Sequence, residues 1–132
     1  MKLTIVRHGQ SEWNKKNLFT GFKDIELTEE GIMEAKECKF QMDSEKYDIA
    51  FTSKLKRAYN TCEIIKEELK QDFPIIYNSS LNERDYGDLT GKNKKEMVEI
   101  YSEKQVHLWR RSIDVRPPNG ENLLDVIDRV KE

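Results

Sequence analysis

Residues 48–77 have the sequence DIAFTSKLKRAYNTCEIIKEELKQDFPIIY, and this stretch establishes the predicted fold class. Its first five residues, Asp48–Thr52, are typical of a short strand, and Ile75–Tyr77 follow Pro74 as a second one. Between the two strands, apolar residues recur at helical spacing among lysines and glutamates. Strands connected through a helix of this length pair in parallel with right-handed crossovers, so the stretch predicts an α/β protein. The apolar positions are Leu55, Ala58, Cys62, Ile65 and Leu69.

The flanking segments extend this alternation of strands and helices. Lys2–Val6 is a β-prone run that ends in a polar loop, which predicts a third strand. Thr28 followed by two glutamates is typical of a helix start and predicts a helix through about Met42. A capping box, a helical stretch and an apolar stripe indicate three more helices, at Asn93 with Glu96, at Gln105–Arg111 and at Leu123–Val130.

The charge balance excludes some classes of protein. The 132 residues fit one domain, residues 1–132, and 23 Lys+Arg against 25 Asp+Glu give a net charge of −2. A general nucleic-acid binder carries a basic surplus instead. No run approaches the roughly 20 apolar residues of a membrane span. We therefore expect a cytoplasmic protein that has neither nucleic acid nor a membrane as its partner.

The residue composition also bears on the core and on the cysteines. Apolar and charged residues each make up 36% of the chain, which predicts a thin core for a globular domain. Cys38 and Cys62 lie far apart, with no further cysteine and no histidine cluster beside them. We expect them to be reduced packing thiols, rather than a disulfide or part of a zinc site.

Chemistry-bearing side chains follow each predicted strand, where open parallel sheets bind their ligands. Together they predict a locally positive edge that attracts anions, which points to phosphate chemistry. There His8 could attack phosphorus, Glu83 could exchange a proton with a hydroxyl, and the Gly9 N–H and arginines could stabilise phosphoryl oxygens. The chain has no P-loop and no metal-ligand cluster, which favours a metal-free route. The segments after the three strands are Arg7–Ser11 with Asn14, Ser53–Arg57 and Asn82–Tyr86.

The segment IVRHGQSEWNKKNLFTG, residues 5–21, closely resembles the histidine phosphatase superfamily, and specifically its cofactor-dependent phosphoglycerate mutases. An Arg-His-Gly tripeptide alone is a weak signal, but four further segments resemble the same family in its order and spacing. The resemblance therefore covers essentially the whole chain. These segments are DIELTEEG (24–31), FTSKLKRA (51–58), LNERDYGDLTGKNK (81–94) and VHLWRRS (106–112).

The resemblance implies an activity and a set of site residues. His8 would be the phosphohistidine nucleophile and Glu83 the proton donor and acceptor. The implied reaction interconverts 3-phosphoglycerate and 2-phosphoglycerate in glycolysis and gluconeogenesis, is primed by 2,3-bisphosphoglycerate and uses no metal. The residues that would hold this small phosphorylated acid are Arg7, Asn14, Thr20, Gly21, Arg57, Arg84, Tyr86, Lys94, Arg110 and Arg111.

The resemblance also implies an architecture, a three-layer sandwich with a mostly parallel sheet. Members of the family continue past the last helix seen here into a strand that carries a second histidine, and then into a closing helix. The other histidine of this chain, His107, lies in the VHLWRRS segment and does not match that position. We therefore expect a mutase-like domain that is incomplete at its C-terminus. A partner chain could restore the sheet by edge pairing, so a homo-oligomer is one expectation.

The sequence also departs from the family pattern at single positions and leaves alternatives open. Asp85 stands where the family commonly has His, Thr90 where Gln is usual, and Phe22 where Trp is usual. The alternatives to a mutase are a catalytically impaired remnant that only binds phosphorylated acids, and a broad phosphatase. Three features resemble the mutase branch and argue against the phosphatase: the Glu83–Tyr86 stretch, Lys94 and the Trp109–Arg111 run.

Overall fold

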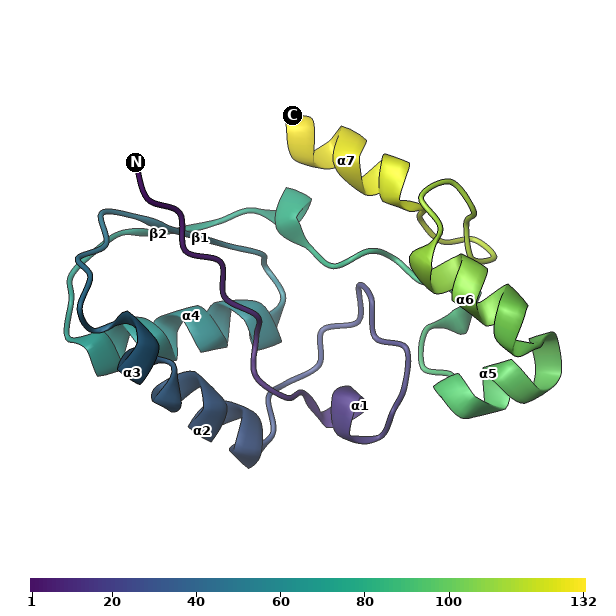
Figure 1. Ribbon diagram of the computed structural model, residues 1–132, viewed down its shortest axis with the longest axis horizontal. Helices are drawn as coiled ribbons and strands as arrows, with labels where there is room; N and C mark the ends of the chain where they lie inside the picture. The colour runs from purple at the N-terminus through teal and green to yellow at the C-terminus, as the bar shows by residue number, and fades with distance from the viewer.

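The computed structural model describes residues 1–132 as an α/β protein (Figure 1). Its strands are β1 (Ala50–Thr52) and β2 (Ile75–Tyr77), followed by the 3-10 turns η1 (Ser79–Leu81) and η2 (Gly87–Leu89). The helices are α1 (Glu12–Lys15), α2 (Glu29–Glu37), α3 (Lys39–Met42), α4 (Lys56–Leu69), α5 (Lys94–Tyr101), α6 (Glu103–Arg111) and α7 (Leu123–Lys131).

The β1–α4–β2 unit has the predicted topology. The two strands pair in parallel, with Ala50 opposite Ile75 and Thr52 opposite Tyr77. Helix α4 connects them, contacts β1 and packs against α2 on its other side. Because the buried face of α4 includes Thr61 as well as Ile65, a polar hydroxyl is carried into the interior next to the N-terminal loop. The α/β class and the parallel pairing predicted from residues 48–77 are confirmed.

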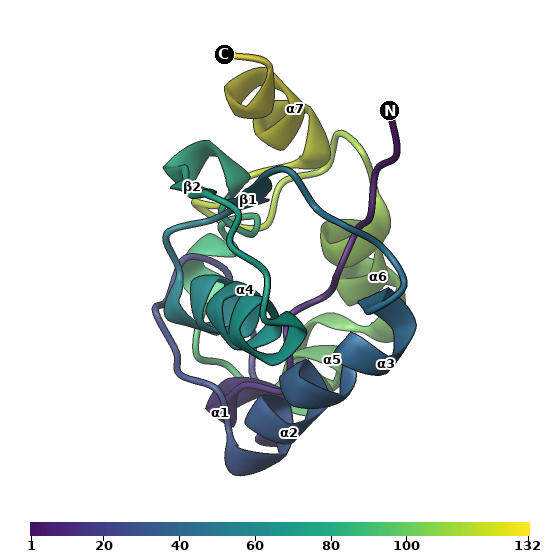
Figure 2. The same ribbon diagram turned by 90° about the vertical axis from the view of Figure 1, so that its left-hand side faces the viewer.

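The strand predicted at Lys2–Val6 is not formed, so the sheet has two strands rather than three. No backbone hydrogen bond joins residues 1–8 to any other segment. The side chain of Ile5 is 85% exposed. Figure 2 shows this segment running to one side of β1 and β2. A β-prone sequence makes a strand only where a neighbouring strand satisfies its N–H and C=O groups, and no other segment of this chain does so.

The predicted helix starts are confirmed with local differences. Thr28 caps α2 by accepting the Gly31 N–H at 3.0 Å, but the helix expected to reach Met42 is interrupted at Cys38 between α2 and α3. Asn93 caps α5 by accepting two N–H groups, without the return bond from Glu96 that a full capping box has. Helix α7 begins with a complete capping box instead, formed by Asn122 and Asp125.

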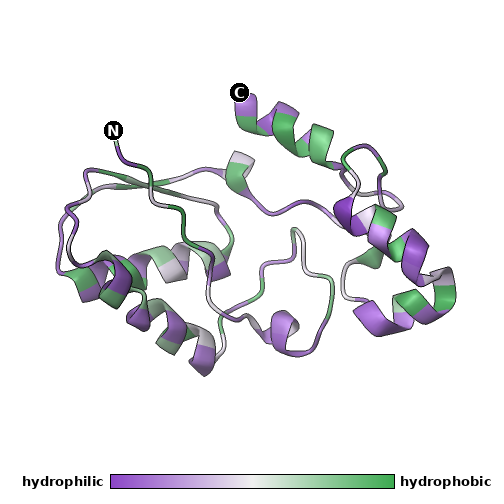
Figure 3. Cartoon of the chain, viewed as in Figure 1, coloured by the Kyte–Doolittle hydropathy of each residue, from purple (hydrophilic) through white to green (hydrophobic).

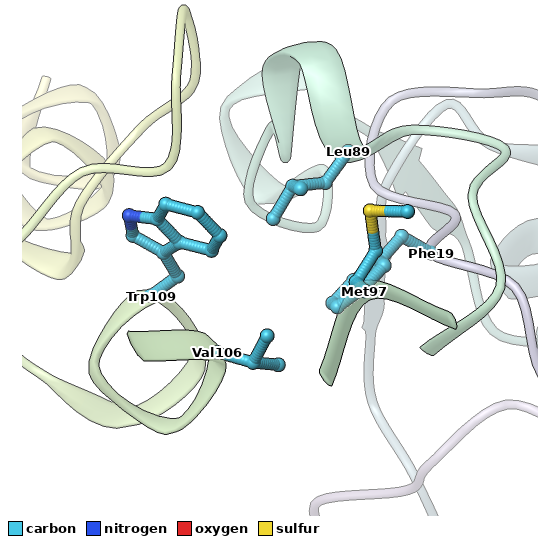
Figure 4. Packing of buried hydrophobic residues seen from close by; sticks show 5 residues of the cluster. All are labelled: Phe19, Leu89, Met97, Val106 and Trp109. Atoms are coloured by element: carbon cyan, nitrogen blue, oxygen red, sulfur yellow. The ribbon is translucent and has the colours of Figure 1, made fainter. Parts of the chain in front are cut away.

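The apolar core is small, as the composition predicts: 22 of the 132 residues are buried. Its main cluster connects α5 and α6 with the loop that follows α1 (Figure 4). Many other apolar side chains are exposed, and Figure 3 shows green hydrophobic stretches along the N-terminal segment and the two strands. No helix is long and apolar enough to cross a membrane. The five residues of the core cluster are Phe19, Leu89, Met97, Val106 and Trp109.

Candidate active site

A polar cavity of about 340 Å³ lies where the N-terminal segment meets α1 and α2. It contains no hydrophobic lining residue, in contrast to the usual mostly apolar pocket for a drug-sized ligand. Such a lining suits a small, strongly charged ligand. Six of the seven residues that line it were singled out from the sequence, namely Arg7, His8, Gly9, Gln10, Asn14 and Lys94, and the seventh is Glu34.

Two glycines place the His8 loop against α2. A Cβ atom on Gly9 would lie 2.2 Å from the carbonyl oxygen of Gly31, and one on Gly31 would lie 2.1 Å from the carbonyl oxygen of Gln10. Only glycine on both sides permits this approach. The Thr28 N–H then donates to the Gln10 carbonyl at 2.9 Å, and Ser11 begins α1 as its N-cap. The loop that carries His8 is therefore fixed at its C-terminal side, although residues before it are not part of a sheet.

The imidazole of His8 has one defined tautomer. Its Nδ1 lies 2.7 Å from the Gly9 carbonyl oxygen, and because a carbonyl can only accept, Nδ1 carries the proton. Nε2 is then the nitrogen with a free lone pair. Burial lowers the pKa of His8 below its ordinary value of 6.5; the Gly9 hydrogen bond acts in the opposite direction, and the Arg57 charge lowers it further. A neutral imidazole with an available Nε2 has the form that a nucleophile requires.

The backbone N–H of Gly9 is not available to a ligand, contrary to the expectation that it would stabilise phosphoryl oxygens. It donates to Thr61 Oγ1 at 3.2 Å, and that hydroxyl donates in turn to the Arg57 carbonyl at 2.7 Å. The close packing of Gly9 on α4 and α2 causes the difference, because it turns the N–H into the interior. In this structure the Gly9 N–H attaches the loop to α4.

Arg57 is 1% exposed and its guanidinium is directed at protein groups. It donates to the carbonyls of Lys23 and Gly21, at 2.7 and 2.6 Å, and its Nη2 donates to Glu83 Oε2 at 2.8 Å. The Glu83 side chain is 41% exposed, so one face of this carboxylate stays open to solvent. Arg57 thus connects the loop after α1 to the predicted acid/base residue, and it does not line the cavity.

Arg84 is the second buried arginine of the predicted set. Its Nη2 donates to the Arg110 carbonyl at 2.9 Å and contacts the Tyr86 hydroxyl at 3.4 Å, while the guanidinium lies 4.8 Å from the centre of the Tyr86 ring. Its Nη1 is the one buried side-chain nitrogen or oxygen without a hydrogen-bond partner. An unpaired buried guanidinium nitrogen is costly, and an anionic ligand would satisfy it.

Lys94 and Arg110 both lie near one aromatic ring. The Lys94 ammonium is 5.8 Å and the Arg110 guanidinium 6.0 Å from the centre of the Phe19 ring. Burial lowers the pKa of Lys94, and the neighbouring charge of Arg110 lowers it further. Arg111 is exposed at the end of α6 and acts on Lys94 in the same direction. These cations repel one another, so an anion bound among them would relieve that repulsion.

Three further predicted residues are held by the protein itself. The Thr20 hydroxyl is buried and donates to the Leu18 carbonyl at 3.4 Å. Gly21 has a positive φ of 54°, and its carbonyl accepts from Arg57. Asn14 Oδ1 accepts the Ser11 N–H at 3.0 Å in the capping box of α1, which leaves its Nδ2 for the cavity.

Sequence reasoning missed Glu34, whose carboxylate lines the cavity on the α2 side and accepts the Gln10 N–H at 3.4 Å. On a helix, a single glutamate has the pattern of an ordinary solvated residue. The available signal was its position three residues after Gly31, on the turn that approaches the His8 loop. The cysteines are free, as predicted, and burial raises the pKa of both Cys38 and Cys62. No group of three or more His, Cys, Asp or Glu side chains could hold a metal ion.

A polar cavity that holds a histidine, an arginine and a lysine suits a small anionic ligand, and the sequence comparisons identify the family. Residues 3–132 match the histidine phosphatase superfamily (branch 1), and the chain belongs to this family. The resemblance inferred from residues 5–21 is thereby confirmed.

The relatives within that family are more specific. The chain is 55% identical over 130 residues to a 2,3-bisphosphoglycerate-dependent phosphoglycerate mutase of Bradyrhizobium sp. (strain BTAi1 / ATCC BAA-1182), covering 96% of this chain and 63% of that protein. It is 54% identical over 131 residues to the protein of the same name from Parvibaculum lavamentivorans, covering 97% and 62%. The chain thus spans about 63% of the length of the curated relatives it matches.

Solved structures share the fold. A mycobacterial glucosyl-3-phosphoglycerate phosphatase in complex with VO3 superimposes with a TM-score of 0.82 at 25% identity, over 92% of this chain and 57% of that one. A structure named mycobacterial hydrolase 1 gives a TM-score of 0.81 at 26% identity, over 94% and 58%. The histidine phosphatase fold is therefore present in the part of these proteins that the chain covers.

Proposed function

We propose that this chain carries the phosphohistidine half-reaction of a 2,3-bisphosphoglycerate-dependent phosphoglycerate mutase, with His8 as the nucleophile. The observation that carries the proposal is the single tautomer of His8, whose Nδ1 is held by the Gly9 carbonyl at 2.7 Å in a cavity lined by Arg7 and Lys94. The identity of 54–55% to proteins named as such mutases supports the choice of substrate. We propose a cytoplasmic, glycolytic role on the same basis.

Each residue of the site has its own role in the proposed phosphoryl transfer. Nε2 of His8 forms a bond to phosphorus while the bond between phosphorus and the ester oxygen breaks, and the Glu83 carboxyl gives its proton to that departing oxygen. Arg7 and Lys94 stabilise the negative charge on the phosphoryl oxygens. Arg57 holds Glu83 through the 2.8 Å contact. The reverse sequence returns the phosphoryl group to the other hydroxyl of the acid.

The donor set fits 2,3-bisphosphoglycerate, which carries two phosphates and one carboxylate. The buried Nη1 of Arg84 has no partner in the protein, and Lys94 and Arg110 are two mutually repelling cations above Phe19. Both features call for an anion with several negative groups. When bound, this molecule supplies the phosphoryl group that primes His8. The residues proposed to hold it and the substrate are Arg7, Asn14, Thr20, Gly21, Arg57, Arg84, Tyr86, Lys94, Arg110 and Arg111.

Intact-mass spectrometry after incubation with 2,3-bisphosphoglycerate tests the proposal. We expect the chain to gain one phosphoryl group, and the His8→Ala variant to gain none, because Nε2 is the only group that forms the bond. His107→Ala is the matched control, because it removes the other histidine of the chain, which is exposed on α6. It should gain the group as the unchanged chain does.

Two other outcomes would reject the proposal in different ways. A folded chain that stays unmodified yet is protected from thermal unfolding by 2,3-bisphosphoglycerate would be a binding remnant without chemistry. Release of inorganic phosphate from the phosphorylated chain faster than formation of 2-phosphoglycerate would indicate a broad phosphatase. The similarity to a mycobacterial phosphatase at 25% identity makes that second measurement worthwhile.

A further inference from the structure

A half-buried ion pair between Glu121, which precedes α7, and Arg129 on α7 holds the chain around Glu83. Arg129 Nε donates to Glu121 Oε2 at 2.8 Å, and the two side chains are only 20% and 18% exposed. The guanidinium is further enclosed by the Phe22 ring, whose centre lies 5.5 Å away. Neither Glu121 nor Arg129 lines the cavity, so their role lies in what they hold.

The remaining donors of Arg129 go to three backbone carbonyls within residues 80–83. Nη1 donates to the Ser80 carbonyl, and Nη2 donates to the Asn82 carbonyl at 2.8 Å and to that of Glu83 at 3.3 Å. Three backbone oxygens within four residues are thus fixed by one guanidinium. A planar fork with five N–H donors is the one side chain that can do this, and lysine cannot replace it.

Glu121 fixes the chain on the other side. Its Oε1 accepts the Asp85 N–H at 3.1 Å, and its own N–H donates to the Asp85 carbonyl at 2.8 Å. The peptide groups that flank Glu83 and Arg84 are therefore attached to one ion pair. We infer that Glu121 and Arg129 are positioning residues that set the direction of the Glu83 carboxylate and the Arg84 guanidinium. This inference rests on the proposed function, in which Glu83 transfers the proton.

Arg129→Met tests the inference, because it removes the donors while keeping most of the side-chain volume. The matched control is Arg116→Met. Arg116 pairs with Asp125 of α7, donating to its carboxylate at 2.7 and 2.6 Å, but it does not touch residues 80–85. Each variant loses one guanidinium ion pair in which α7 supplies one partner, so an effect common to both reflects α7 and not the contacts with residues 80–85.

Amide hydrogen exchange gives the first readout and needs no phosphoryl transfer. We expect Arg129→Met to speed exchange across residues 80–86 about tenfold or more relative to Arg116→Met, while the amides of α4 stay protected and show that the chain is folded. Equal exchange of residues 80–86 in the two variants would overturn the inference, because the segment would then keep its position without Arg129.

The rate of His8 phosphorylation by 2,3-bisphosphoglycerate gives the second readout. Arg129→Met should lower this rate about tenfold, less than the roughly 10²–10⁴-fold that a general acid–base group contributes, because Glu83 is still present but less well directed. Combined with Glu83→Gln, it should lower the rate no further than Glu83→Gln alone, because both changes remove the same proton transfer. If the rate losses of the two single variants multiply in the double variant, Arg129 does not act by positioning Glu83. Absence of phosphorylation in the unchanged chain would contradict the proposed function instead, and the exchange data would then decide the inference.

Discussion

The neutral state of His8 follows from where the glycines place its loop. Gly9 and Gly31 approach so closely that neither tolerates a Cβ, and this contact fixes the loop that carries His8. Burial lowers the pKa of His8 below 6.5, with the Arg57 charge acting in the same direction. The tautomer is set separately, by the Gly9 carbonyl that accepts from Nδ1.

Titration of His8 by NMR tests whether the packing of its loop lowers the pKa of the imidazole. We expect a midpoint below the ordinary 6.5, and in Gly31→Ala, if folded, a midpoint closer to 6.5 because the loop is pushed outward. As pH falls below 6.5 the unfolded chain takes up the proton first, so this group reduces stability on acidification and contributes nothing above 6.5. A midpoint at or above 6.5 in the unchanged chain would contradict the enclosure of His8.

Single residues differ in how far the sequence could place them. His8 and Glu83 were predicted because each follows a predicted strand or matches a family motif. Glu34 was not, because a glutamate on a helix is ordinarily solvated, and it reaches the cavity only through a glycine contact between distant segments. The engagement of the Gly9 N–H by Thr61 is equally non-local, since 52 positions separate the two residues.

Among the elements, those that depend on neighbours in sequence were predicted correctly, whereas the strand predicted at Lys2–Val6, which depends on a distant neighbour, does not form. The β1–α4–β2 unit is complete within residues 48–77, and its strands satisfy each other. Lys2–Val6 has the composition of a strand but no partner for its backbone. Propensity describes what a segment can do, whereas a sheet also requires an adjacent edge.

Helix α4 offers a direct test of its terminal geometry. Lys70 ends the helix in the left-handed conformation, with φ of 54° and ψ of 38°, where a side chain is strained. Lys70→Gly should raise the free energy of unfolding by about 0.5–1 kcal/mol, since glycine adopts this conformation without a Cβ penalty. Lys70→Ala keeps the Cβ and should change stability little. Denaturant melts of the two variants compare them, and equal midpoints would refute the strain.

Across the whole molecule, burial is low and unevenly distributed. The core cluster packs α5 against α6, and α2 packs against α4 in a second group. The N-terminal segment lies outside both of these groups. The composition predicted this thin core because its apolar share is small. It could not predict which apolar residues would be excluded, since that depends on which backbone segments find partners.

Hydrogen exchange should reveal this unevenness directly. We expect the amides of residues 2–6 to exchange as fast as in an unstructured peptide, because none is hydrogen-bonded, and those of Thr61–Leu69 in α4 to exchange far more slowly. The Gly9 amide, held by Thr61, marks the boundary and should be slower than that of Arg7. Uniform protection from residue 2 onward would mean that the segment is paired in solution.

The hydrogen bonds from Arg129 to the Ser80, Asn82 and Glu83 carbonyls have a consequence for how the protein folds during translation. Between 46 and 49 positions separate Arg129 from the carbonyls that it holds. A ribosome therefore releases His8, α2 and α4 well before Arg129, the residue that fixes the segment carrying the proposed acid/base residue Glu83. During translation, the loop of the proposed nucleophile can pack on α2 and α4 while the Glu83 segment is still free to move. The Glu83 segment acquires the position seen here only after α7 has emerged.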